Sequence, residues 1–278
     1  MGTIILLTLK EAMRRRAFLG TILILVVLYG LSFLPKAFHE AFGGSERRFE
    51  MGLQLMVSFG VDSIKFFSSV LAIVLCAGTL TGEIERGYLS AILPRPIYRW
   101  QVYLGKWLGV IFFCLANAVL WTAMLWVSVF LQGKVHYEMW FALPYVLLYP
   151  MLYGTLALVF SSFAGTAVSL MLTVAMGALA YFSDHILRPL AGFFDVVILQ
   201  RIVWFSEWVV PMAVLKRFVA VYTRPNFTGR MEEMPFGSEE VRLFLNPPAR
   251  EWELGYVLVY IGLTLLIGGI LFQRRDVQ

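Results

Sequence analysis

The chain has 278 residues, of which 59% are hydrophobic and only 15% are charged, whereas soluble domains typically have about 45–50% and about 25%. This composition excludes a disordered chain and an ordinary cytosolic enzyme, because so few charged residues cannot cover the surface of a soluble domain of this length. The formal net charge of +5 does not by itself point to nucleic acid, since in a membrane protein the basic residues first report which segments face the cytoplasm. We predict no nucleic acid partner.

Six apolar stretches come close to the roughly 20 residues that a transmembrane helix requires. We place these spans at about 17–35, 64–82, 107–131, 139–161, 165–183 and 254–272. Short gaps separate the third, fourth and fifth spans, so these should be antiparallel neighbours. The sequence therefore predicts an all-α, polytopic membrane protein that forms a single transmembrane domain over residues 1–278.

Residues 4–16 precede the first span and are predicted to form a helix that lies in the membrane interface. Apolar side chains fall near one face of this helix: Ile5, Leu6, Leu9 and Met13. The alternative is a cytoplasmic extension of the first span. The basic cluster at 14–16 would suit a signal peptide, but the apolar run is long and no small-residue cleavage site follows, so we interpret it as a retained anchor.

The distribution of short-loop charges sets the orientation. Basic residues exceed acidic ones in both terminal segments and between the second and third spans: Lys10, Arg14, Arg15, Arg16, Arg86, Arg95, Arg99, Lys106, Arg274 and Arg275 against Glu11, Glu83, Glu85 and Asp276. By the positive-inside rule both termini face the cytoplasm. We predict a multi-pass protein of the prokaryotic cytoplasmic (inner) membrane.

The outer segments are then a loop of residues 36–63, a short segment of residues 132–138 and a large external region of residues 184–252. Residues 184–222 are rich in aromatic and aliphatic side chains but contain several charges and Pro211. Because each charge is costly at the centre of a membrane, interfacial or re-entrant helices are favoured over a seventh span.

Catalytic, cofactor and metal motifs are missing from the sequence. There is no Gly-rich phosphate-binding loop, so any ATP must be bound by another polypeptide. The three histidines lie in separate outer segments, and Asp184 and His185 are adjacent and should not share a helical face. Cys76 and Cys114 are predicted to be buried hydrophobic residues. The most polar candidate at mid-membrane depth is Asn117, for which an interhelical hydrogen bond is the simpler interpretation.

The cytoplasmic segment between the second and third spans is the most informative part of the chain. It reads TGEIERGYLSAILPRPIYRWQVYLGK over residues 81–106. A charged edge at 83–86 is followed by a short amphipathic helix, and Pro94 and Pro96 then prevent a continuous helix. Such a segment suits a partner protein, but a solvated loop whose arginines reach lipid phosphates fits equally well.

The same segment resembles the cytoplasmic signature of ABC-2 type transporter permeases. The matching positions are Gly82, Glu83, Glu85, Gly87, Leu89, Pro96, Arg99, Gly105 and Lys106. The sequence departs from the signature at Tyr88, at Ser90 with Ala91, and at Pro94. The amino-terminal helix, the six spans and the external region before the last span agree with this family as well.

The resemblance implies a permease subunit that pairs, as a homodimer or a heterodimer, with two copies of an ATP-binding subunit. That subunit would bind ATP and Mg, and this chain would bind no cofactor. Residues 83–106 would hold the coupling segment, with polar contacts from Glu83, Glu85, Arg86, Arg95 and Arg99, apolar contacts from Leu89, Ile92 and Leu93, and backbone breaks at Gly87 and Pro96.

Two functions of different classes remain open at this point. The first is an ATP-driven exporter that moves cargo across or out of the membrane. The second is a mechanical or regulatory module that acts through the external region on a periplasmic or extracellular protein. A stand-alone channel or secondary carrier is disfavoured, because such proteins usually place charged groups near the membrane centre. Membrane lipid is a partner in every case.

Overall fold

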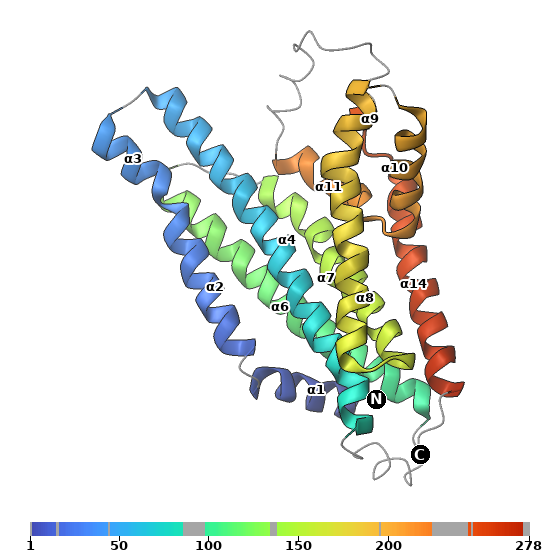
Figure 1. Ribbon diagram of the computed structural model, residues 1–278. Coiled ribbons are helices and arrows are strands. Elements are labelled where there is room, and N and C mark those ends of the chain that lie inside the picture. Colours follow the sequence, from blue (N-terminus) through green and yellow to red (C-terminus); the bar gives the residue numbers. More distant parts are fainter. Residues whose placement is uncertain are drawn as a thin grey trace.

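The computed structural model describes residues 2–14, 17–43, 45–85, 98–133, 138–194, 196–223, 244–245 and 247–274, and the regular structure within these ranges is helical (Figure 1). The helices are α1 (Gly2–Arg14), α2 (Ala17–Ser32), α3 (Leu34–Phe42), α4 (Glu46–Glu85), α6 (Arg99–Leu131), α7 (Glu138–Phe163), α8 (Thr166–Phe182), the π-helical turn η1 (Ser183–Leu187), α9 (Arg188–Phe194), α10 (Val197–Val209), α11 (Met212–Thr223) and α14 (Glu251–Arg274). Six helical stretches are long and apolar enough to cross a membrane. The predicted all-α, polytopic membrane fold is therefore confirmed.

Helices α4, α6 and α7 form the centre of the bundle. In their most apolar windows 61%, 56% and 72% of the residues are buried, against 11%, 22% and 17% for the spans that contain α2, α8 and α14. Because lipid is as apolar as a leucine side chain, helices in a membrane associate through close fit and hydrogen bonds. The three central helices are thus the scaffold, and α2, α8 and α14 present most of their surface outward.

Small residues bring the central helices together. Gly154 of α7 lies against α4, where an added Cβ atom would be 3.3 Å from both the Cβ atom of Ala72 and the Sγ atom of Cys76. Nearby, the hydroxyl of Ser161 in α7 donates a 2.9 Å hydrogen bond to the carbonyl of Ala77 in α4. A larger side chain at Gly154 would separate the two helices.

The predicted loop at residues 36–63 is wrong, because α3 and the first half of α4 occupy it. Helix α4 contains 40 residues and is therefore about 60 Å long, twice the roughly 30 Å hydrocarbon core of a membrane. Glu46, Arg47 and Arg48 are exposed on its first turn. These charges lie at the very start of α4, so the helix extends beyond the apolar layer at this end.

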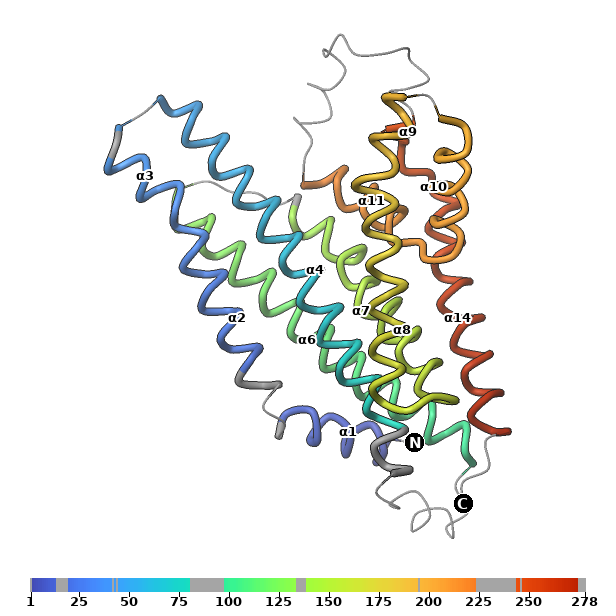
Figure 2. The backbone as a smooth tube through the Cα atoms, in the orientation of Figure 1, coloured from blue at the N-terminus to red at the C-terminus, as the bar shows by residue number. Residues whose placement is uncertain are grey.

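Both described ends of the chain pack against the first half of α6. Gly109 of α6 lies against Thr8 of α1, and the Nη1 atom of Arg99 donates a 3.2 Å hydrogen bond to the carbonyl of Gln273 in α14. In Figure 2 these contacts lie at one end of the bundle. We call this the α1 end, and the opposite end, which carries α9 and α10, the distal end.

Helix α1 is a separate helix, as predicted, but its apolar face is divided. Thr8 and Ala12 are buried, whereas Leu6, Leu7 and Met13 are exposed. The buried side is the one with small residues because α1 crosses α6 closely at Gly109. The larger apolar side chains face away from the protein, as expected of a helix that touches a membrane surface.

Candidate functional site

The residues predicted to contact an ATPase subunit lie at the α1 end or outside the described residues. Glu83 and Glu85 belong to the last turn of α4, and Arg99 is the first residue of α6. The remaining predicted contact residues lie outside the described residues: Arg86, Gly87, Leu89, Ile92, Leu93, Arg95 and Pro96. The coupling segment therefore stays a prediction, anchored on both sides by helices of the central scaffold.

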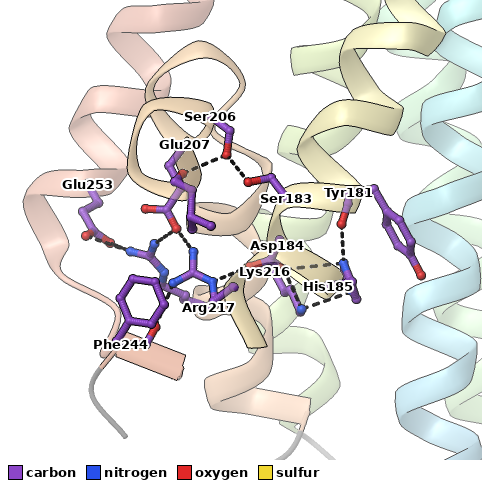
Figure 3. Close-up of polar contacts among 12 residues, drawn as sticks. Tyr181, Ser183, Asp184, His185, Ser206, Glu207, Lys216, Arg217, Phe244 and Glu253 are labelled. Carbon is purple, nitrogen blue, oxygen red and sulfur yellow. Dashed lines mark hydrogen bonds and ion pairs between the residues drawn. The ribbon is translucent and has the colours of Figure 1, made fainter. Parts of the chain in front are cut away.

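The distal end contains a cluster of charged side chains that the sequence analysis did not bring together (Figure 3). We define the charge cluster as Asp184, Arg188, Glu207, Lys216, Arg217 and Glu253, with His185 at its edge. Its members come from η1, α9, α10, α11 and α14.

A π-helical turn places the first members of the charge cluster. Helix α8, η1 and α9 form one helical stretch, Thr166–Phe194, so the predicted external region begins inside this helix. The Nζ atom of Lys216 is 2.6 Å from Oδ2 of Asp184 and 3.2 Å from Nε2 of His185. The expectation that two adjacent residues would point apart is wrong here. A π-helical turn contains an extra residue, which changes the direction of its side chains.

The guanidinium of Arg188 lies between two carboxylates. Its Nε atom donates a 3.0 Å hydrogen bond to Oδ1 of Asp184, its Nη2 atom contacts Oε1 of Glu207, and its Nη1 atom donates a 3.0 Å hydrogen bond to the carbonyl of Phe244. The side chains of Arg188 and Asp184 are only 7% and 8% exposed. Arg188 thus links α9 to α10 and fastens residue 244 to both.

Arg217 continues the cluster toward the last span. Its Nη1 atom is 3.0 Å from both carboxylate oxygens of Glu253, and its Nη2 atom contacts Oε1 of Glu207. The order of contacts is Lys216, Asp184, Arg188, Glu207, Arg217 and Glu253, so the sign of the charge alternates at every step. The three carboxylates balance the three basic groups, and each charge has a partner of opposite sign.

Hydrogen bonds from α14 support a break in the backbone between α10 and α11. These two helices are bent by 87° relative to each other, as a broken span or a re-entrant loop. At the end of α10 the carbonyl of Trp208 accepts a hydrogen bond from Tyr256, and that of Val209 accepts one from Tyr260 at 2.6 Å. The bend agrees with the prediction that residues 184–222 do not form a straight seventh span. Irregular backbone at membrane depth needs such internal partners.

The charge cluster is suited to holding helices together. Among the described residues no group of three or more histidine, cysteine or acidic side chains could hold a metal ion. Burying ions costs free energy that pairing recovers only when the geometry is good, and removing one partner from such a pair typically costs about 3–5 kcal/mol. The arrangement therefore fixes the position of α10 and α11 against α9 and α14.

Sequence reasoning missed this cluster because it counted the charges of residues 184–222 only as evidence against a span. Two signals were present: the i, i+4 pair of Asp184 and Arg188, and the i, i+4 tyrosines at 256 and 260.

Asn117 also differs from the expectation, since its side chain donates a hydrogen bond to the carbonyl of Phe113 in its own helix. Cys76 and Cys114 are buried and free, as predicted.

The fold defines a multi-pass α-helical membrane protein with an amino-terminal helix and a bent helix pair before its last span. Comparison with protein families gives a match to the family described as "ABC-2 family transporter protein" over residues 3–277. The chain belongs to this family, and it is a membrane component of an ABC transporter. No curated protein sequence matches it.

Proposed function

We propose that the chain is the permease subunit of an ATP-driven exporter, in which a separate ATP-binding subunit hydrolyses ATP and this chain moves cargo across or out of the membrane. Membership of the ABC-2 family over nearly the whole chain is the observation that carries the proposal. In this function two ATP-binding subunits bind ATP and Mg, and two permease chains pair as a homodimer or a heterodimer. The membrane is the prokaryotic cytoplasmic membrane, with both termini cytoplasmic.

The position of the segment between α4 and α6 supports coupling at the α1 end. This segment joins the carboxyl end of α4 to the amino end of α6, two of the three scaffold helices. Arg99 at the start of α6 is hydrogen-bonded to the end of α14. A displacement of the segment by an ATPase subunit would therefore act on α4, α6 and α14 at once.

The first experiment is isolation of the tagged chain from native membranes in mild detergent, followed by mass-spectrometric identification of its partners. We expect an ATP-binding subunit in near-equal amount. A chain that is isolated alone, and that transports a solute by itself in liposomes, would contradict the proposal and favour a channel or secondary carrier.

The second experiment tests the coupling segment in the intact complex. The double variant Glu85→Lys with Arg86→Glu reverses two adjacent charges that we propose contact the ATPase subunit. We expect ATP hydrolysis to continue while transport falls at least about tenfold, because a loss of about 1.4 kcal/mol in a coupling interaction corresponds to that factor.

A matched control reverses the same two residue types at the opposite end of α4, the helix whose last residue is Glu85. Glu46 and Arg47 are adjacent and exposed on the first turn of α4, so Glu46→Lys with Arg47→Glu should leave coupling intact. Equal effects of the two double variants would contradict the assignment of residues 83–106 as the coupling segment.

A mechanical module is the second candidate, and the charge cluster is the observation that favours it. The cluster fixes α10 and α11 to α14, whose other end contacts the start of α6. Movement at the α1 end could thus displace the whole distal end as a unit. Stimulation of ATP hydrolysis by a cargo molecule supports export, whereas stimulation only by an external protein supports the mechanical function.

A further inference from the structure

One basic residue of α10 stands apart from the charge cluster. Helices α9, α10 and α11 contain five charged residues, and in the described part of the chain Arg188, Glu207, Lys216 and Arg217 all form ion pairs. Arg201 of α10 forms none and is exposed. The charges around it are already balanced, so nothing in the described structure neutralises its guanidinium.

The surface around Arg201 is apolar. The residues three and four positions away on α10 are Val197, Ile198, Trp204 and Phe205, with exposed fractions of 58%, 67%, 62% and 66%. Residues at these spacings share one helical face. The opposite face carries Val203, which is 2% exposed. Arg201 therefore lies at the centre of an exposed apolar face on a helix at the periphery of the distal end (Figure 1).

This combination fits one kind of occupant. A guanidinium pairs best with a carboxylate or a phosphate group, through parallel hydrogen bonds. Tryptophan side chains are enriched at the depth of lipid headgroups, and Trp204 is one helical turn from Arg201. The aliphatic and aromatic neighbours offer a surface for a hydrocarbon chain on either side of the charge.

We propose that this face of α10 is a binding site for a glycerophospholipid, with the phosphate on Arg201 and an acyl chain along Val197, Ile198 and Phe205. The site is separate from the coupling segment and does not depend on which cargo the transporter moves. A soluble oxyanion lacks the acyl chain and so does not fill the site, and a lipid without a phosphate leaves Arg201 without its counterion.

The test is native mass spectrometry of the intact complex, titrated with dioleoylphosphatidylglycerol and, in parallel, with dioleoylglycerol, which has the same acyl chains and no phosphate. We expect the phospholipid to be retained preferentially. The Arg201→Gln variant should weaken its binding about fivefold, since a basic residue at a lipid surface contributes about that factor, and Arg201→Lys should weaken it less.

Arg250→Gln is the matched control. Arg250 is also exposed at the distal end without an ion pair in the described structure, but it lies in the irregular segment before α14, beside Pro248 and Ala249. Its loss should leave phospholipid binding unchanged. Equal binding by the wild type and Arg201→Gln would overturn the proposal, as would equal effects of the two glutamine variants, equal retention of the two lipids, or displacement by inorganic phosphate.

A second measurement locates the bound lipid. Phosphatidylglycerol with brominated acyl chains should quench the fluorescence of Trp204. The Trp204→Phe variant identifies how much of the total quenching comes from this residue, and that share should also be lost in Arg201→Gln. If the quenching of Trp204 fluorescence persists in Arg201→Gln, the helix face contacts bulk lipid and has no phosphate site. Burial of this face by a second copy would abolish Trp204 quenching in the wild type and would equally overturn the proposal.

Discussion

The centre of the bundle and its distal end are assembled from opposite kinds of side chain. At the centre, α4, α6 and α7 approach through residues as small as Gly154 and Ala72, and the contacts are apolar apart from bonds such as that between Trp107 and Thr155 at 3.0 Å. At the distal end, η1, α9, α10, α11 and α14 meet through six charges of alternating sign.

The difference has a physical reason. Apolar side chains in a membrane can exchange a helix neighbour for lipid at little cost, so the centre depends on fit. A buried charge has no such substitute, and it accepts only a partner of opposite sign in the right place. Charges therefore specify where the bent α10 and α11 pair sits, while close packing determines how firmly the scaffold holds.

Arg188→Gln should have the largest effect, and it should be confined to the distal end. Arg188→Gln would leave the three carboxylates of the cluster with only two basic groups, Lys216 and Arg217. One buried negative charge would then be unbalanced, which should lower the local stability of α10 and α11 by about 3–5 kcal/mol. Hydrogen exchange followed by mass spectrometry should show faster exchange in these two helices and unchanged exchange in α4 and α7.

Lys36→Gln provides the control for Arg188→Gln. Lys36 forms an ion pair with Glu40 at 4.0 Å in which the side chains are 47% and 66% exposed, so its loss should change stability by no more than about 1 kcal/mol. Faster exchange throughout the bundle in Arg188→Gln would show that the two regions do not respond separately.

Gly268→Val should affect the centre of the bundle instead. An added Cβ at Gly268 of α14 would collide with Tyr103 of α6 and would be 2.7 Å from Val159 of α7. Overpacking of this kind usually costs about 1–3 kcal/mol. Thermal unfolding can be followed with a thiol-reactive dye, because Cys76 and Cys114 are buried in the scaffold and react only when it opens.

Gly262→Val is the matched variant for this measurement. It lies in the same helix and an added Cβ would meet nothing within 4 Å, so it undergoes the same change in helix propensity without the collision. We expect a lower unfolding temperature for Gly268→Val alone. Similar values for both variants would indicate that α14 does not depend on close contact with the scaffold.

The sequence predicted the centre of the protein better than its distal end. Hydropathy predicted six spans because each must be apolar over the thickness of a membrane, and the described structure has six helical stretches long and apolar enough for this. It failed at residues 46–63, where a helix continues beyond the apolar layer and charged residues on its surface resemble a loop. The burial of Cys76 and Cys114 followed from apolar neighbours in the sequence itself.

The charge cluster could not be assembled from the sequence, since its partners are far apart in the chain. Arg217 and Glu253 meet only because α11 and α14 pack side by side, and Arg188 reaches Phe244 across a long connection. The π-helical turn that aims both Asp184 and His185 at Lys216 also leaves no clear signal in composition. The coupling residues of segment 83–99 were recognisable only by their resemblance to the family signature.

Tyr260→Phe should have the smallest effect and shows what the charges contribute beyond hydrogen bonding. The variant removes one neutral hydrogen bond to the carbonyl of Val209, and such bonds between membrane helices contribute about 0.6 kcal/mol on average. We expect a slight acceleration of hydrogen exchange in α10 and α11, measured beside Tyr98→Phe, in which the ring is 69% exposed. A carbonyl at a helix end can accept from another donor, whereas the loss of Arg188 leaves three carboxylates to share two basic groups. If hydrogen exchange in α10 and α11 accelerates as much in Tyr260→Phe as in Arg188→Gln, the distal end is held together by hydrogen bonds to the backbone carbonyls at the bend and not by the ion pairs.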